Sequence, residues 1–221
     1  MSIASPQQPQ TIADMLDALG DIPPERVLMN PPPGTATEQD AIQCEARQNR
    51  LCELVDGTLV EKAVGYHESI IAGAILALLR AFVIPRNLGC VSGSDGMMRL
   101  FPGLIRMPDV AFASWSRFPG GRLPVEPAPS IAPDLAIEVL SVSNTDREMQ
   151  RKRCEYFAAG VSLVWIIDPR QRIALVYTSP DEFTEYGASD SLTGGEVLPG
   201  FTLSLSELFA ELDRQADGLK P

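Results

Sequence analysis

Hydrophobic and polar positions follow two rhythms along the chain, the alternation typical of strands and the longer period typical of helices. A hairpin is predicted at 51–61, where two apolar runs flank Asp56-Gly57. Helical periodicity predicts helices at about 67–84 and 145–159, the second with a Thr145-x-x-Glu148 capping box. Further apolar runs predict strands at about 96–101, 105–114, 135–141, 161–167, 173–178 and 201–205. This order predicts an α/β (α+β) domain, a mixed sheet flanked by helices.

The predicted helix at 67–84 is apolar around most of its girth, so we expect it to be buried. Its most apolar stretch, 70–79, ends at Arg80 and is half the roughly 20 residues that a membrane span needs. The first ten residues have neither a basic n-region nor an apolar h-region, so nothing indicates secretion. We therefore expect a cytoplasmic protein with no membrane partner.

Residues 1–49 are predicted to be an N-terminal extension, partly disordered, with short helices near 11–19 and 38–48 around a proline-rich loop. The main domain is expected at 50–214, followed by a disordered tail at 215–221.

Four cysteines at irregular spacings, with no C-x-x-C pair, exclude the usual zinc knuckles and indicate no disulfide framework. We expect them to be separate thiols in a reducing cytoplasm. The single histidine, His67, excludes a two-histidine metal site and is interpreted as structural or substrate-lining. Hydrolytic chemistry would therefore depend mainly on carboxylates and lysine.

The formal net charge is −11, but the charge is uneven. Residues 80–122 carry a net charge of +4 and residues 145–153 a net charge of +2. These two basic islands could hold a phosphate backbone locally, with weak binding that falls with salt. An equally good interpretation is that their arginines solvate ordinary strand ends.

Two carboxylates are notable for their positions in apolar strands. Asp109 follows Pro108 at the mouth of one strand, and Glu138 lies in the middle of another. Alternation places Glu138 on the face opposite Ile137. Burial of a lone carboxylate is costly, so each must be paired, bound to metal or at the edge of a pocket. A structural ion pair between Glu138 and an arginine is the alternative.

The helix at 145–159 offers a cation. Its helical phase places Lys152 at the border of the buried stripe, with Arg153 equally close. Both could instead be side chains that snorkel over the helix edge.

Four short motifs occur in a familiar order, and together they resemble the Uma-two family of endonucleases. This family belongs to the restriction-endonuclease-like PD-(D/E)XK superfamily. The resemblance covers about residues 50–210 and implies an αβββαβ core. The motifs are Glu53-Leu54-Val55-Asp56-Gly57, Pro108-Asp109-Val110-Ala111-Phe112, Glu138-Val139-Leu140-Ser141 and Lys152-x3-Tyr156-x3-Gly160-Val161. Leu140 stands where the superfamily has its lysine, and the resemblance implies that Lys152 replaces it.

The function implied is a Mg²⁺- or Mn²⁺-dependent endonuclease that hydrolyses phosphodiester bonds in DNA. Asp109, Glu138 and the Val139 carbonyl would be the metal ligands, and Lys152 would orient water or stabilise charge. Glu53 is a further candidate catalytic residue, with Glu61 and Glu68 as alternatives for an added ligand or water bridge.

Two other functions are weighed. The main rival is a catalytically inactive module on the same fold that binds nucleic acid or protein. A glycosidase that uses Asp109 and Glu138 is disfavoured, because only 6% of the residues are aromatic. A homodimer is left open.

Overall fold

The computed structural model describes residues 10–63 and 65–215. The disorder expected at both ends falls on residues 1–9 and 216–221 and so lies outside the described residues. The helices are α1 (Ile12–Ala18), α2 (Glu38–Gln48), α3 (Tyr66–Val83), α4 (Asp146–Ala158) and α5 (Leu205–Ala210). The strands are β1 (Cys52–Val55), β2 (Thr58–Glu61), β3 (Gly89–Ser92), β4 (Met98–Phe101), β5 (Leu104–Arg106), β6 (Val110–Ser114), β7 (Leu135–Val139), β8 (Leu163–Asp168), β9 (Ile173–Tyr177), β10 (Phe183–Tyr186), β11 (Ser191–Gly194) and β12 (Leu198–Ser204).

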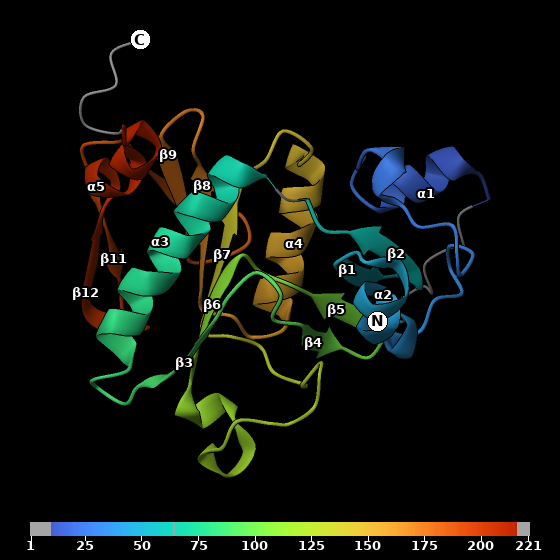
Figure 1. Cartoon of the computed structure of the whole chain (residues 1–221), viewed down its shortest axis with the longest axis horizontal. Coiled ribbons are helices and arrows are strands. Elements are labelled where there is room, and N and C mark those ends of the chain that lie inside the picture. The colour runs from blue at the N-terminus through green and yellow to red at the C-terminus, as the bar shows by residue number, and fades with distance from the viewer. Residues whose placement is uncertain (1–9, 64, 216–221) are drawn as a thin grey trace.

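The central element is a six-stranded sheet in the order β10-β9-β8-β7-β6-β3. Strands β7 and β8 are parallel, and the other neighbours are antiparallel. Helix α3 covers one face of this sheet and α4 the other (Figure 1). The predicted mixed α+β architecture is confirmed.

The two helices meet opposite faces of β7. Leu135, Ile137 and Val139 join the apolar cluster that contains Ile71 and Ile75 of α3. Ala136 lies on the other face, in a cluster with residues of α4. The predicted alternation along this strand is therefore confirmed.

A second sheet, in the order β2-β1-β5-β4, stands beside α4 (Figure 1). The prediction was wrong in assigning the run at 96–101 to the core, because it forms β4 of this small sheet. The three core strands between α3 and α4 are β3, β6 and β7, and β3 was missed. The run predicted at 105–114 is divided between both sheets, since Pro108 cannot donate a ladder hydrogen bond.

Helix α3 is less buried than its composition predicts. Ile71, Ile75 and Leu79 pack on the sheet, but Leu78 is 47% exposed on the outer side. By length and composition alone α3 could cross a membrane. The sequence prediction did not indicate this, because it counted only the ten most apolar residues of the helix, 70–79. A single such helix is a weak indication, and here it packs on the central sheet. The absence of a membrane partner and the cytoplasmic location stay predictions.

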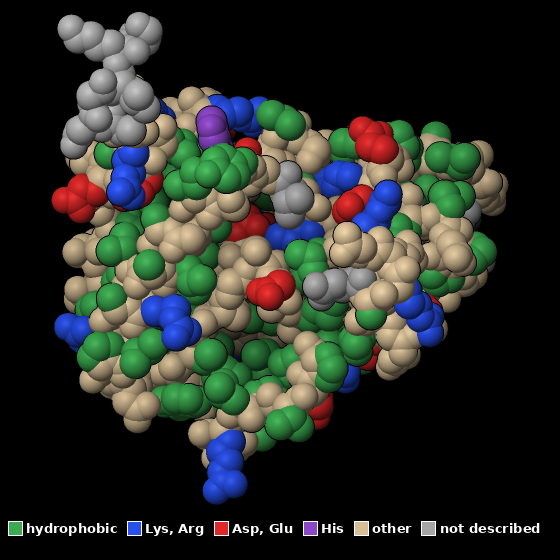
Figure 2. All heavy atoms as spheres, viewed as in Figure 1, with side chains coloured by type: hydrophobic (Ala, Val, Ile, Leu, Met, Phe, Trp, Pro, Cys, Tyr) green, Lys and Arg blue, Asp and Glu red, His purple; other side chains and the backbone are tan. Residues whose placement is uncertain are grey.

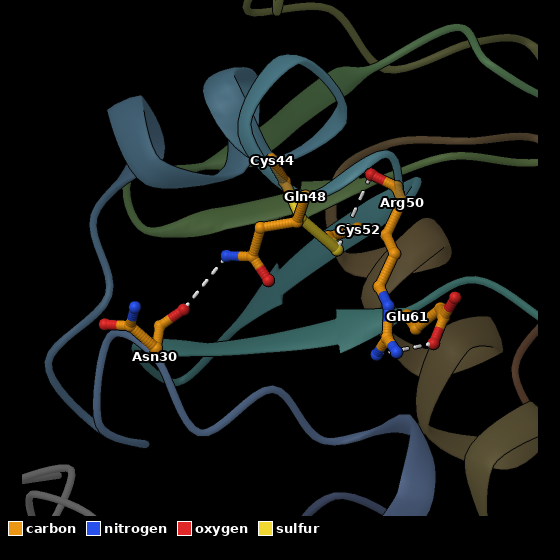
Figure 3. Close-up of a disulfide and its surroundings, with 6 residues drawn as sticks. All are labelled: Asn30, Cys44, Gln48, Arg50, Cys52 and Glu61. Atoms are coloured by element: carbon orange, nitrogen blue, oxygen red, sulfur yellow. Dashed lines mark hydrogen bonds and ion pairs between the residues drawn. A yellow bond between two sulfur atoms is a disulfide. The ribbon is translucent and has the colours of Figure 1, made fainter.

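Two of the four cysteines are joined, which corrects the expectation of separate thiols. Cys44 of α2 and Cys52 of β1 form a disulfide (Figure 3). Because α2 packs on β1, their Cα atoms lie 6.3 Å apart, a proximity that the spacing of the cysteines does not reveal. Cys90 and Cys154 are free.

The N-terminal segment packs against the β1–β2 hairpin and α4. Helix α1 is capped by Thr11, whose side chain forms a capping box with Asp14. Ile22 and Val27 share an apolar cluster with Val60 of β2. The proposed domain limits at 49 and 214 stay a prediction.

Candidate active site

The candidate site forms where β6 and β7 lie side by side. Asp109 immediately precedes β6, and the backbone N–H of Val139 donates to its Oδ2 at 2.7 Å. Glu138 is next to Val139 and is 5% exposed, on the α4 side of the sheet. The two carboxylates predicted from separate motifs therefore come from neighbouring strands.

Lys152 of α4 lies at Glu138. Its Nζ donates to both carboxylate oxygens of Glu138 at 3.2 Å and is 3.3 Å from Oε1 of Glu53. The residue is 3% exposed, so it is buried and does not snorkel. The partner of Glu138 is thus a lysine, and the alternative of an arginine ion pair is wrong.

Glu53 of β1 is fully buried and connects the small sheet to the site. Its Oε2 accepts a hydrogen bond from Arg106 Nη1 at 2.7 Å, and its Oε1 accepts one from the backbone N–H of Met107 at 3.0 Å. Arg106 also pairs with Glu155 of α4 at 2.6 Å. Glu53 therefore positions the segment that leads into Asp109.

Sequence reasoning missed Lys62, which directly follows β2. Its Nζ lies 2.9 Å from Oδ1 of Asp109 and also donates to the carbonyl oxygen of Met107. It is 5% exposed. In the sequence Lys62 is simply a charged residue at the end of an apolar hairpin strand. This position does not reveal that Asp109 is its partner.

Tyr156 was also missed as a site residue, although it lies in one of the family-like motifs. Its hydroxyl donates to Oε1 of Glu138 at 2.6 Å. It comes from α4, one turn after Lys152. The Glu138 carboxylate thus accepts hydrogen bonds from the Tyr156 hydroxyl and from the Lys152 ammonium group.

The two buried glutamates respond to their surroundings in opposite directions. Burial raises the pKa of Glu138, and the nearby Asp109 carboxylate raises it further, against the opposing effect of Lys152. Burial would also raise the pKa of Glu53, but Lys152 and Arg106 more than offset it, so that this pKa is lowered. The charge on Glu53 is therefore stabilised, while the charge on Glu138 is not.

A cavity of about 160 Å³ opens beside Asp109. Its walls include Glu68 and Ser69 of α3, Ser94 after β3, and Val139. Figure 2 shows acidic and basic side chains meeting in a hollow between α3 and the part of the molecule that carries β1 and β2. Of the four predicted site residues, Asp109 is the one that lines this cavity. His67 is exposed and is not among the lining residues.

The site fits a hard divalent cation in its donor chemistry. Asp109 and Glu68 line one cavity, and carboxylate oxygens suit Mg²⁺ or Mn²⁺ as ligands. Among residues 10–63 and 65–215, however, no group of three or more His, Cys, Asp or Glu is arranged to hold a metal ion. Asp109 and Glu138 instead have ammonium partners. A metal ion at these carboxylates would therefore compete with the two ammonium groups.

Several arginines of the two basic islands already have partners in the protein. In the first island, Arg99, Arg106 and Arg117 pair with Glu38, Glu53 and Asp134. In the second, Arg153 lies over the Tyr177 ring at 4.2 Å and donates to the Pro180 carbonyl, so it is engaged away from Glu138. The arginines that were expected to meet a phosphate backbone mostly have partners already.

Comparison with known proteins adds a family and a fold. The family model Uma2, described as “Putative restriction endonuclease”, matches residues 38–206. The chain is also similar to a solved structure, a “putative nuclease belonging to DUF820” from Anabaena variabilis ATCC 29413, with 21% identity and a TM-score of 0.67. That match covers 75% of this chain and 93% of the other and shows the fold alone. No curated protein matches the chain significantly.

Proposed function

The chain belongs to the Uma2 family, and on that premise we propose that it is a metal-dependent DNA endonuclease of the PD-(D/E)XK type. The family description and the naming of the solved neighbour as a nuclease support a nuclease-like function. The metal, the DNA substrate and the residue roles given below are part of the proposal.

One observation carries it. Asp109 and Glu138 come from adjacent strands, each contacts a buried lysine of its own, Lys62 and Lys152, and a cavity opens at Asp109. The raised pKa of Glu138 supports a functional role, because a carboxylate whose charge is disfavoured by its site is typical of functional positions. A purely structural carboxylate would be better compensated, as Glu53 is.

The proposed ligands are Asp109 and Glu138, with Glu68 as a further oxygen donor at the cavity. A bound Mg²⁺ or Mn²⁺ would lower the pKa of a water molecule and polarise a phosphodiester oxygen. Val139 orients Asp109 through its backbone N–H, and Tyr156 orients Glu138 through its hydroxyl.

Lys152 takes the role that Leu140 cannot fill. Its ammonium stabilises the negative charge that builds up on the phosphate in the transition state, or orients the attacking water. Glu53 is assigned a positioning role, since its contacts are with Arg106, Met107 and Lys152. DNA binding is expected to be weak and to fall with salt, because Arg99, Arg106 and Arg117 of the first island are already in ion pairs.

Nicking of supercoiled plasmid DNA tests the proposal. With Mg²⁺ or Mn²⁺ the wild-type protein should convert supercoiled to open-circular plasmid, and a chelator should abolish this activity. Asp109→Asn and Glu138→Gln should each lower the rate by about 100-fold or more while circular dichroism shows an intact fold. Asp95→Asn removes an exposed carboxylate from the loop after β3 and should nick at the wild-type rate.

The rival function is a catalytically inactive module that binds nucleic acid or protein. Its specific support is that Asp109 and Glu138 already have cationic partners, and that Leu140 replaces the superfamily lysine. If the wild-type protein nicks no plasmid with either metal but binds DNA in a salt-sensitive way, the binding module is correct. DNA binding without salt dependence, or no DNA binding, would favour a protein partner or a second copy of this chain.

A further inference from the structure

Lys62 Nζ lies 2.9 Å from Oδ1 of Asp109, one of the proposed metal ligands. We propose that its ammonium holds this cation position in the metal-free protein and must be displaced by the divalent ion, so that Lys62 sets the metal affinity of the site. This inference rests on the proposed function. It concerns a residue outside the four motifs that resemble the family, and it assigns the regulation of the site to a side chain of the β1–β2 hairpin.

Positive and negative charges are balanced around Lys62. The buried and half-buried carboxylates of this connected cluster are matched by an equal number of cations. They are Glu53, Asp109, Glu138, Glu148 and Glu155 against Arg26, Lys62, Arg106, Arg151 and Lys152. A divalent ion would add two positive charges to a cluster that is already compensated. In a buried cluster like charges repel strongly, so metal binding is favourable only if one of the cations leaves.

The cations at the site differ in how many carboxylates hold them. Arg106 is paired on both sides, with Glu53 and Glu155, at 2.7 and 2.6 Å. Lys152 lies between Glu138 and Glu53, and the Glu148 carboxylate also favours its charge. Lys62, by contrast, makes one ion pair, with Asp109, and one bond to a backbone carbonyl. It has the fewest carboxylates in direct contact of the three cations.

A cavity lies close to the Lys62 ammonium group. Its backbone is anchored, since its N–H donates to the Leu51 carbonyl at 2.8 Å, but its ammonium is at the end of a flexible four-carbon stem. The cavity of about 160 Å³ begins at Asp109, the residue that Lys62 contacts. Asp109 and Ala63, the residue after Lys62, both line this cavity, so it is the space into which the proposal moves the ammonium.

The proposal is tested by measuring Mn²⁺ binding to the full chain, without any measurement of cleavage. Calorimetry gives the affinity, and the electron paramagnetic resonance of the free ion checks it. Lys62→Met should bind Mn²⁺ about tenfold or more tightly than the wild type, because it removes the competing charge. Lys62→Gln, which retains a donor for the Met107 carbonyl, should show the same gain and covers the case in which the methionine variant does not fold.

Arg50→Met is the matched control. Arg50 pairs with Glu61, the residue before Lys62, at 3.1 Å on the surface of the same hairpin (Figure 3). This variant removes an equal charge and should bind Mn²⁺ like the wild type. Adding Asp109→Asn to Lys62→Met should abolish the gain.

The inference is overturned if both Lys62 variants fold and bind Mn²⁺ no more tightly than the wild type, or if no variant binds it. Failure of the proposed function has a different signature. A wild-type protein that nicks no plasmid, together with a Lys62 variant that gains Mn²⁺ affinity, supports the role of Lys62 and contradicts the nuclease. A wild-type protein that nicks plasmid, with unchanged Mn²⁺ affinity in the Lys62 variants, supports the nuclease and contradicts the role of Lys62.

Discussion

The two faces of β7 contrast sharply although their residues alternate along one strand. On the α3 side, Leu135, Ile137 and Val139 are at most 4% exposed and contact apolar side chains. On the α4 side, Glu138 meets Lys152 and Tyr156. One face holds the fold together through hydrophobic burial, and the other holds a cluster of buried charges that costs desolvation free energy.

This difference shows where function is encoded in the sheet. An apolar face tolerates exchange of one hydrophobic side chain for another of similar volume. A charged face depends on particular pairs, because the loss of one partner leaves the other buried and unpaired. Even within the charged face, Glu53 and Glu138 differ, since their pKa values shift in opposite directions.

The largest expected effect is a loss of stability when the charge of Glu53 is removed, because two cations compensate that charge. Glu53→Gln should lower the free energy of unfolding by about 3–5 kcal/mol, because Arg106 and Lys152 lose a buried partner. Glu138→Gln is the matched change on β7 and should cost much less, since its environment disfavours the charge and glutamine still accepts from Tyr156. Urea unfolding of both variants measures the difference. Equal losses would show that the two carboxylates have the same structural role.

The contrast between the faces also explains what the sequence could predict. Alternation in β7 and the Thr145 cap of α4 are local patterns, and both were predicted. Asp109 and Glu138 could be found because a carboxylate inside an apolar strand is anomalous by itself. Lys62 and Arg106 could not be assigned, because their significance lies in partners that are 47 and 53 residues away in the sequence. The disulfide and the missed strand β3 likewise depend on tertiary packing.

A change on the apolar face should separate stability from chemistry. Ile137→Val removes one methylene group from a fully buried side chain and should lower the free energy of unfolding by about 0.5–1.5 kcal/mol. Because Ile137 points away from Glu138, the variant should keep the wild-type Mn²⁺ affinity and plasmid nicking. Thermal unfolding and Mn²⁺ titration of one preparation provide both measurements. A loss of metal affinity as large as that of Asp109→Asn would mean that the two faces are coupled.

The smallest expected effect is on the stability of the folded protein at low pH. It concerns the ion pair between Arg26 and Glu148. Glu148 of α4 accepts two hydrogen bonds from Arg26 of the N-terminal segment, at 2.9 and 2.7 Å. Arg26 also donates to the carbonyls of Glu61 and Ser143, so it connects the hairpin end to the segment after β7. Burial would raise the pKa of Glu148, but Arg26 and Lys152 more than offset this and lower it.

A carboxylate with a lowered pKa in the folded protein stabilises it above the unfolded-state pKa, and this contribution is lost as the pH falls through the folded-state value. Unfolding free energy should therefore decrease from about pH 4.5 downward. Glu148→Gln should be less stable near neutral pH, because Arg26 loses its charged partner, but its stability should fall less steeply with acid. Urea unfolding at a series of pH values gives the two slopes. Parallel curves would mean that Glu148 titrates alike in both states and that Arg26 contributes through its carbonyl contacts instead.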